Sequence, residues 1–161
     1  MQIRPAAISD IDGILPMVAR ICAFHEQQAP HKYPFLSHPE QRYHWWLTRI
    51  VETGNGVLLV AEVEGKLVGF TVATIEDEIP IYRVKRFGFV HDLWVELDYR
   101  RRGIGRALIG ELVGRLRAME VEQIRLDVLV NNESARKLCA ACGFAPSTIE
   151  MLLPLREPAR K

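Results

Sequence analysis

The stretch YRRRGIGRAL, residues 99–108, places three consecutive arginines directly before two glycines in a G-x-G spacing. Gly103 and Gly105 let the backbone approach a ligand without a side chain in the way. The first N–H groups of a helix lack intrahelical partners and favour anions. An arginine side chain can donate two parallel hydrogen bonds to the oxygens of one phosphate. The sequence therefore predicts a turn that binds a diphosphate. Its members are Arg100, Arg101, Arg102, Gly103, Ile104, Gly105 and Arg106.

Two widespread phosphate-binding motifs do not account for this turn. The nucleotide P-loop pattern G-x-x-x-x-G-K-[ST] is absent from the chain. The dinucleotide fingerprint G-x-G-x-x-G fails because Leu108 stands at the third glycine, and because the turn does not follow the first strand of the chain. Two interpretations remain, another kind of diphosphate site or a glycine turn with a solvated basic patch.

Apolar periodicity indicates the elements that must position the turn. A strand predicted at 88–96 precedes the turn, and a helix predicted at 103–119 follows it. With the next strand, at 123–130, this order implies a parallel strand pair joined by a crossover helix. The turn signal Glu64-Gly65 between two apolar runs predicts an antiparallel hairpin. Further strands are expected at 2–4, 57–63, 66–75, 123–130 and 149–153. Helices are expected after a cap at Ser9, at 40–52, and from a cap at Asn132 to Gly143.

These elements predict an α/β (α+β) fold with a mixed, mostly antiparallel sheet flanked by helices. The chain has 161 residues, which suits one domain with a sizeable core. We expect that domain to cover residues 1–155 and residues 156–161 to form a flexible tail.

The composition argues against several classes of protein. The formal net charge is +1, and the arginines gather locally instead of covering a whole face, so we expect no nucleic-acid partner. No apolar run is long enough to cross a bilayer, and the N-terminus lacks the apolar core of a signal peptide. We therefore expect a cytoplasmic protein with no membrane partner. Three cysteines, an odd number, do not make a secreted disulfide framework.

The cysteine pair Cys139-x-x-Cys142 has the spacing of a redox or metal motif. It also continues the helical stripe of Ala135 and Leu138, and no second such pair completes a zinc site. Small buried apolar side chains are the favoured interpretation. The histidines at 25, 31, 38 and 44 show no compact ligand spacing, so no metal is expected.

Three segments together resemble the GNAT superfamily of acetyl-CoA-dependent N-acetyltransferases. The turn matches the family's Q/R-x-x-G-x-G/A signature through Arg100, Gly103 and Gly105. The segment IRPAAISDIDGI is similar to the family's first strand and helix, and GFVHDLWVELDYRRRGIGRALI to its fourth strand and following helix. The segment NNESARKLCAACGF is similar to the family's N-x-x-A-x-x-L-Y-x-x-x-G-F pattern through Asn132, Ala135, Leu138, Gly143 and Phe144.

The resemblance implies where coenzyme A binds. The backbone of residues 101–106 would hold the pyrophosphate, and a V-shaped splay between the fourth and fifth strands would expose a strand edge. Pantetheine would pair with that edge at Leu93, Trp94 and Val95, where a backbone N–H would polarise the acetyl carbonyl. Asn132 matches the asparagine that contacts the pantetheine arm, and it also suits a helix N-cap.

The resemblance also implies catalytic candidates next to this edge. The segment around His91 and Asp92 resembles IEDF(F/Y)V of spermidine/spermine-type acetyltransferases, with His91 at the glutamate position. Histidine suits a base or proton relay, although a buried histidine bonded to a backbone carbonyl is the alternative. Asp92 would point to the opposite face of a regular strand, unless a bulge intervenes. Cys139 replaces the usual tyrosine acid with a weaker donor.

We therefore expect an enzyme that transfers an acetyl group from acetyl-CoA directly to an amine of a small molecule, peptide or protein. The acceptor pocket is expected along the loop 25–35, and the resemblance favours a homodimer. The alternative is a non-catalytic acyl-CoA sensor or interaction module on the same fold, since the tyrosine is missing. A nucleic-acid-binding domain that uses the arginine patch is a weaker third interpretation.

Overall fold

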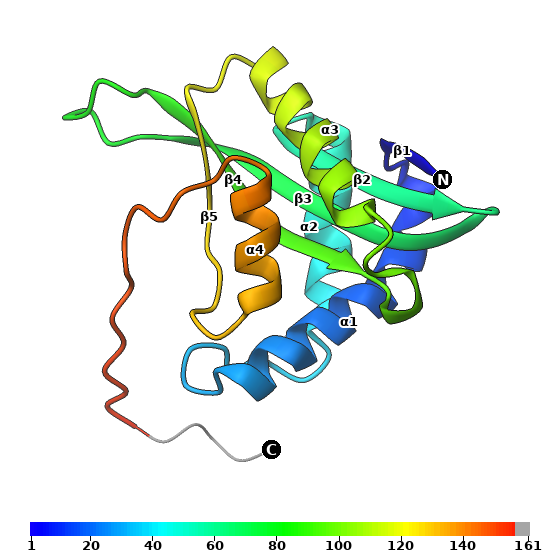
Figure 1. Ribbon diagram of the computed structural model, residues 1–161, viewed down its shortest axis with the longest axis horizontal. Helices are drawn as coiled ribbons and strands as arrows, with labels where there is room; N and C mark the ends of the chain where they lie inside the picture. Colours follow the sequence, from blue (N-terminus) through cyan, green and yellow to red (C-terminus); the bar gives the residue numbers. More distant parts are fainter. Residues whose placement is uncertain (157–161) are drawn as a thin grey trace.

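A five-stranded sheet in the order β1-β2-β3-β4-β5 is the centre of the computed structural model, which describes residues 1–156 (Figure 1). The first three strand pairs are antiparallel and β4 pairs with β5 in parallel. The mixed, mostly antiparallel sheet is thus confirmed. The elements are β1 Gln2–Pro5, η1 Ile8–Asp10, α1 Ile11–Gln28, α2 Pro39–Thr53, β2 Gly56–Val63, β3 Lys66–Asp77, β4 Arg86–Val95, η2 Leu97–Tyr99, α3 Ile104–Ala118, β5 Gln123–Leu126 and α4 Glu133–Ala141.

Helices cover both faces of the sheet and divide its core in two (Figure 1). On one face α1 and α2 pack around Phe70 and Val72 of β3. On the other face α3 packs its stripe of Leu108, Leu112 and Leu116 against β2, β3 and β4. Within residues 1–156 no helix is long and apolar enough to span a bilayer.

The β2–β3 hairpin turns where the sequence predicts it, at Glu64 and Gly65. Their φ angles are +52° and +75°, so both residues are left-handed, as in the turn type that suits the twist of paired strands. Strand β5 is shorter than the sequence predicts. The strand ends at Leu126 instead of residue 130, because the chain there turns away from β4.

The final strand predicted at 149–153 is wrong, since none of residues 127–156 forms a strand. The side chains of Ile149, Met151 and Leu153 are about four-fifths exposed or more. An alternating apolar pattern requires a neighbouring strand before it can form a ladder, and this segment has none in the structure. The tail predicted at 156–161 lies outside the described residues except for Arg156.

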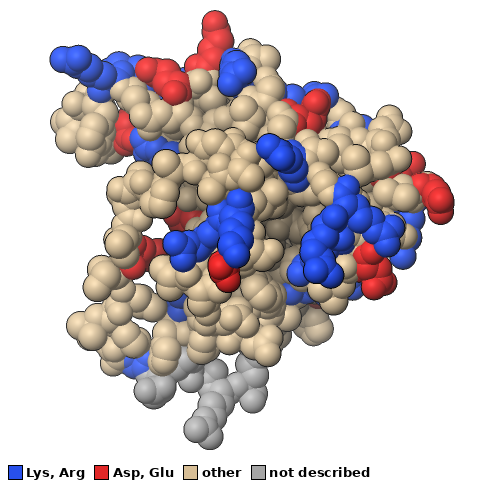
Figure 2. Space-filling model, in the orientation of Figure 1, with Lys and Arg blue, Asp and Glu red and all other residues tan. Residues whose placement is uncertain are grey.

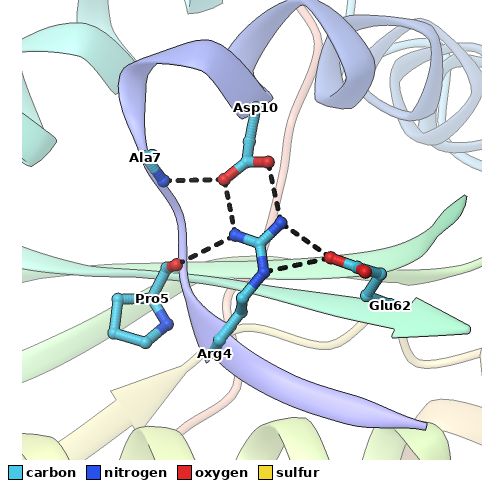
Figure 3. Close-up of polar contacts among 5 residues, drawn as sticks. All are labelled: Arg4, Pro5, Ala7, Asp10 and Glu62. Carbon is cyan, nitrogen blue, oxygen red and sulfur yellow. Dashed lines mark hydrogen bonds and ion pairs between the residues drawn. The ribbon is translucent and has the colours of Figure 1, made fainter. Parts of the chain in front are cut away.

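A guanidinium network ties the start of the chain to the sheet (Figure 3). Arg4 of β1 donates two hydrogen bonds to Asp10, at 2.7 and 2.9 Å, and two to Glu62 of β2, at 3.1 and 2.8 Å. Asp10 also accepts from the Ala7 N–H at 2.7 Å. Asp10 thus organises the entry to α1 and is its N-cap, whereas the sequence predicted Ser9 as the cap.

Replacement of Arg4 by leucine is expected to lower the free energy of unfolding by about 1.5–3 kcal/mol at neutral pH. The Arg4 guanidinium lowers the pKa of Asp10 below 3.8. A depressed acid pKa stabilises the fold above pH 3.8 and stops doing so as the pH falls. Urea unfolding at pH 7 and at about pH 2 tests this, with the exposed Arg42→Leu as control. An effect of equal size at both pH values would contradict it.

Candidate functional site

The turn before α3 starts the helix without a side-chain cap. Gly103, the N-cap of α3, has a φ of +82° and supplies no capping side chain. The N–H groups of Ile104, Gly105 and Arg106 therefore begin the helix without intrahelical partners. Arg101 also has a positive φ, +59°, so two of three consecutive residues have a left-handed backbone conformation. This conformation leaves the positive end of α3 open to an anion.

The side chain of Arg100 does not extend toward that opening. Its Nε donates to the carbonyl oxygen of Val95 at 2.8 Å, and its guanidinium lies 4.7 Å from the centre of the Trp94 ring. The first arginine of the signature is thus folded over the end of β4. This hydrogen bond uses one of the two lone pairs of the Val95 carbonyl oxygen, so a ligand that bonds to the same oxygen has to share it with Arg100.

The other arginines of the turn differ in how free they are. Arg102 stacks over the Tyr99 ring at 5.3 Å, and Arg106 donates to the carbonyl oxygen of Ala141 in α4 at 3.2 Å. Arg101 is exposed, and among the described residues its side chain has no ion-pair or hydrogen-bond partner. Figure 2 shows basic side chains gathered near this turn and over α4.

The start of α3 packs closely against α4. A Cβ atom on Gly105 would lie 3.0 Å from Cδ2 of Leu138 and 3.9 Å from Cγ2 of Val95. Gly105 therefore keeps the two helices close while leaving the backbone accessible. The glycine that the sequence singled out for ligand approach also serves helix–helix packing.

An open strand edge begins where β4 separates from β5. The β4–β5 pairs run from Phe87↔Gln123 to Val90↔Leu126, whereas β4 stays paired with β3 as far as Val95. The predicted splay between the fourth and fifth strands is thus confirmed.

Alternation along β4 decides which of its backbone groups face the open edge. The Glu96 N–H donates to Val68 of β3. Successive residues of a strand turn their backbone groups to opposite neighbours. Leu93 and Val95 therefore offer their N–H and C=O groups to the open edge, while those of Trp94 face β3.

A β-bulge places His91 and Asp92 on the same face of the sheet. Val72 of β3 pairs with Asp92, but the next residue, Ala73, pairs with Val90, so His91 is an extra residue. Val90 packs with α3, whereas the side chains of His91 and Asp92 both meet α2. Of the two arrangements expected from the sequence, a regular strand and a bulged one, the structure has the bulged one.

Asp92 is a buried carboxyl held by one phenol. Its side chain is 5% exposed and accepts a hydrogen bond from the Tyr43 hydroxyl at 2.9 Å. Burial raises the pKa of Asp92 to about 6, and the Tyr43 hydrogen bond partly opposes that rise. The group therefore changes charge close to neutral pH.

The raised pKa of Asp92 is expected to make the protein less stable as the pH rises. Below pH 3.8 the carboxyl is protonated in both states; between 3.8 and about 6 only the unfolded chain ionises. Relative to Asp92→Asn, the wild type should lose about 2 kcal/mol of unfolding free energy from pH 4 to pH 7. Denaturant titrations of both proteins measure this loss, and a constant difference would contradict it.

His91 lies at the exposed rim of the same face. Its ring packs edge-on against Trp46 and Phe89, with centroids 5.0 Å apart in each pair. Its Nε2 lies 2.7 Å from Oγ1 of Thr74. Partial burial lowers the pKa of His91, and the Glu76 carboxylate opposes that shift. The imidazole is thus largely neutral near pH 7, as a base must be.

Asn132 and Cys139 lie on α4. The Asn132 side chain caps the helix by accepting from the Ala135 N–H at 3.2 Å, which leaves its NH₂ group for another contact. Burial raises the pKa of the Cys139 thiol, with a smaller contribution from Cys142. All three cysteines are free thiols, and the described residues contain no group of histidine, cysteine and carboxylate side chains that could hold a metal.

The sequence did not indicate the two residues whose hydroxyl groups form hydrogen bonds with Asp92 and His91. Tyr43 reaches Asp92 across 49 positions and Thr74 reaches His91 across 17, and neither lies in a motif. The signal for Thr74 was a hydroxyl residue within the apolar run of β3. A strand buried on both faces retains a polar side chain only where it has a partner.

A family model shows which family this chain belongs to. The model of the acetyltransferase (GNAT) family matches residues 20–144. The chain therefore belongs to the GNAT acetyltransferases, and the resemblance drawn from the three motifs is confirmed.

Several of the relatives and solved structures that it resembles are N-acetyltransferases. It is 28% identical over 134 residues to the [ribosomal protein bS18]-alanine N-acetyltransferase of Escherichia coli, covering 79% of this chain and 75% of that protein. It is 29% identical over 150 residues to an N-alpha-acetyltransferase of Sulfurisphaera tokodaii, covering 89% of this chain and 79% of that protein. The fold matches the CoA complex of aminoglycoside N-acetyltransferase AAC(6')-Iy with a TM-score of 0.74 and 15% identity, covering 96% of this chain and 99% of that one.

Proposed function

We propose that this protein transfers the acetyl group of acetyl-CoA directly to an amine. One observation carries the proposal: β4 separates from β5 directly after Val90, and the next residue is the bulged His91. The open edge suited to the cofactor and the candidate base thus begin at the same point of the sheet. Membership of the GNAT family supports this assignment.

Coenzyme A is assigned to the turn and to the edge of β4. The N–H groups of Ile104, Gly105 and Arg106 and the free Arg101 side chain would hold the diphosphate. Pantetheine would pair with Leu93 and Val95, and the NH₂ group of Asn132 would contact the same arm. An N–H on this edge would stabilise the oxyanion, a contribution of about two to three powers of ten in rate.

His91 is assigned the role of base in this proposal. An acceptor ammonium, with a pKa of about 10 if it is lysine-like, must lose a proton before it attacks. The amine nitrogen then forms a bond to the acetyl carbon, and the C–S bond breaks. Because burial holds the proton on Cys139, we assign the proton of the CoA thiol to the attacking nitrogen or to water. Asp92 would help to orient the acceptor.

The acceptor in this proposal is the amino group of a peptide or protein. The names of two relatives, a ribosomal-protein-alanine and an N-alpha-acetyltransferase, support that class. A cytoplasmic location and a homodimer complete the proposal. The location is supported by the need for acetyl-CoA, and sedimentation of the purified protein measures the oligomeric state.

Calorimetric titration with acetyl-CoA tests the proposal first, with adenosine diphosphate and NAD as comparison ligands. Selective binding of acetyl-CoA, followed by release of CoA thiol with a panel of peptides and small amines, is the expected result. Binding without thiol release for any amine would favour the sensor alternative. Absence of acetyl-CoA binding would contradict both.

A further inference from the structure

A hydrogen-bond chain leads from His91 to the surface of β3. His91 Nε2 lies 2.7 Å from Oγ1 of Thr74, and this hydroxyl donates to Oε1 of Glu76 at 2.5 Å. Thr74 is buried at 9% exposure, and Glu76 is exposed. Since Thr74 and Glu76 lie two apart on one strand, both side chains lie on the face that carries His91.

The number of protons in this chain fixes the form of the imidazole. An ionised carboxylate only accepts, so the single hydroxyl proton of Thr74 points to Glu76. The hydroxyl oxygen can then only accept from His91, which requires a proton on Nε2. In the neutral ring the lone pair is therefore on Nδ1. Among the described residues no group bonds to Nδ1, so it is free to take a proton.

We infer that Thr74 and Glu76 are positioning residues that hold His91 as the Nε2–H tautomer, with Nδ1 as the atom that takes the acceptor proton. The inference rests on the proposed function and assigns it two further residues. Thr74 sets the tautomer and the direction of the ring. Glu76 is connected to the imidazole through two hydrogen bonds, by way of Thr74, and it stabilises the positive charge that forms when Nδ1 is protonated.

The protons balance along this route. An acceptor ammonium gives one proton to Nδ1, and its nitrogen then forms the C–N bond while the C–S bond breaks. A second proton from the same nitrogen ends on the CoA sulfur. The proton on His91 is the one released to solvent. The charged and titratable groups around the imidazole are Glu76 of β3, Asp92 beside it on β4, and the Tyr43 phenol of α2.

Nitrogen NMR of the histidine rings tests the tautomer without requiring turnover. The chain has five histidines, and the His91 signals are those lost in His91→Ala. In the wild type we expect a proton on Nε2 and none on Nδ1. In Thr74→Val, which keeps the shape but lacks the hydroxyl, we expect a mixture of tautomers. A proton on Nδ1 in the wild type, or an unchanged spectrum in Thr74→Val, would overturn the inference.

Kinetics test whether this arrangement matters for transfer. We expect Glu76→Gln and Thr74→Val each to lower kcat about tenfold, a part of the 10²–10⁴-fold that a general base contributes. Thr74→Ser, which keeps the hydroxyl, should retain most of the wild-type kcat. Because the carboxylate raises the pKa of His91, Glu76→Gln should also move the acidic limb of kcat/KM to lower pH.

The neighbouring exposed carboxylate provides a matched control. Asp77→Asn removes the same charge one residue further along β3, where the side chain points away from His91. Asp77→Asn should leave the acidic limb of the kcat/KM profile at the wild-type pH. An equal shift in Asp77→Asn would mean that only long-range charge acts and would overturn the role of Glu76. Absence of turnover in the wild type would contradict the proposed function, while the NMR result would still decide the tautomer.

Discussion

Replacement of His91 by alanine is expected to lower kcat about 100-fold, the lower end of what a general base contributes. Acetyl-CoA affinity should stay within about twofold, because the imidazole faces α2 and not the turn before α3. The side chain lies at an exposed rim, so the variant should fold. Steady-state kinetics and acetyl-CoA titration of the same preparation separate the two effects.

A second histidine variant provides the control for this experiment. His44 is exposed on α2, and its Nε2 lies 3.6 Å from a carboxylate oxygen of Asp12. His44→Ala should keep the wild-type kcat. Full turnover of His91→Ala across the pH range would remove His91 from the mechanism.

Gly105→Trp is expected to weaken acetyl-CoA binding at least 100-fold, the loss of about 3 kcal/mol of binding free energy. The indole would fill the space between α3 and α4 and cover the N–H groups of the turn. The variant should also be less stable, by about 1–3 kcal/mol, since its Cβ presses on Leu138. Calorimetry measures the affinity, and thermal unfolding shows that the protein tested is folded.

The same helix offers a matched position for the control. Gly110 is exposed, and a Cβ there would meet no atom within 4 Å. Gly110→Trp should therefore bind acetyl-CoA like the wild type. If Gly105→Trp bound equally well in its folded form, the turn before α3 would not be the diphosphate site.

Features set by local sequence could be predicted. The hairpin at Glu64 and Gly65 depends on a glycine, which accepts a positive φ, between two apolar runs, and the turn at Gly103 on a glycine before an apolar helix. Both signals lie within a few residues of the structure that they specify. The order of strands and helices follows from the same short-range patterns.

Features that depend on distant partners could not be predicted. Nothing near Asp92 in the sequence points to Tyr43, which reaches it from α2. The apolar alternation at 149–153 is typical of a strand, yet a ladder needs a neighbour that the pattern does not contain. Arg100 fits the signature, but its guanidinium lies over Trp94, a contact decided by tertiary packing.

The bulge gives strand β4 an unusual tolerance to loss of a residue. His91 is the extra residue opposite Val72 and Ala73, so a chain lacking it would pair regularly, with Asp92 still toward α2. Loss of Leu93 would instead close the bulge by turning the Asp92 carboxyl toward the apolar side of α3. Insertions and deletions could therefore remove or introduce the imidazole in a single step during evolution, without repacking either core.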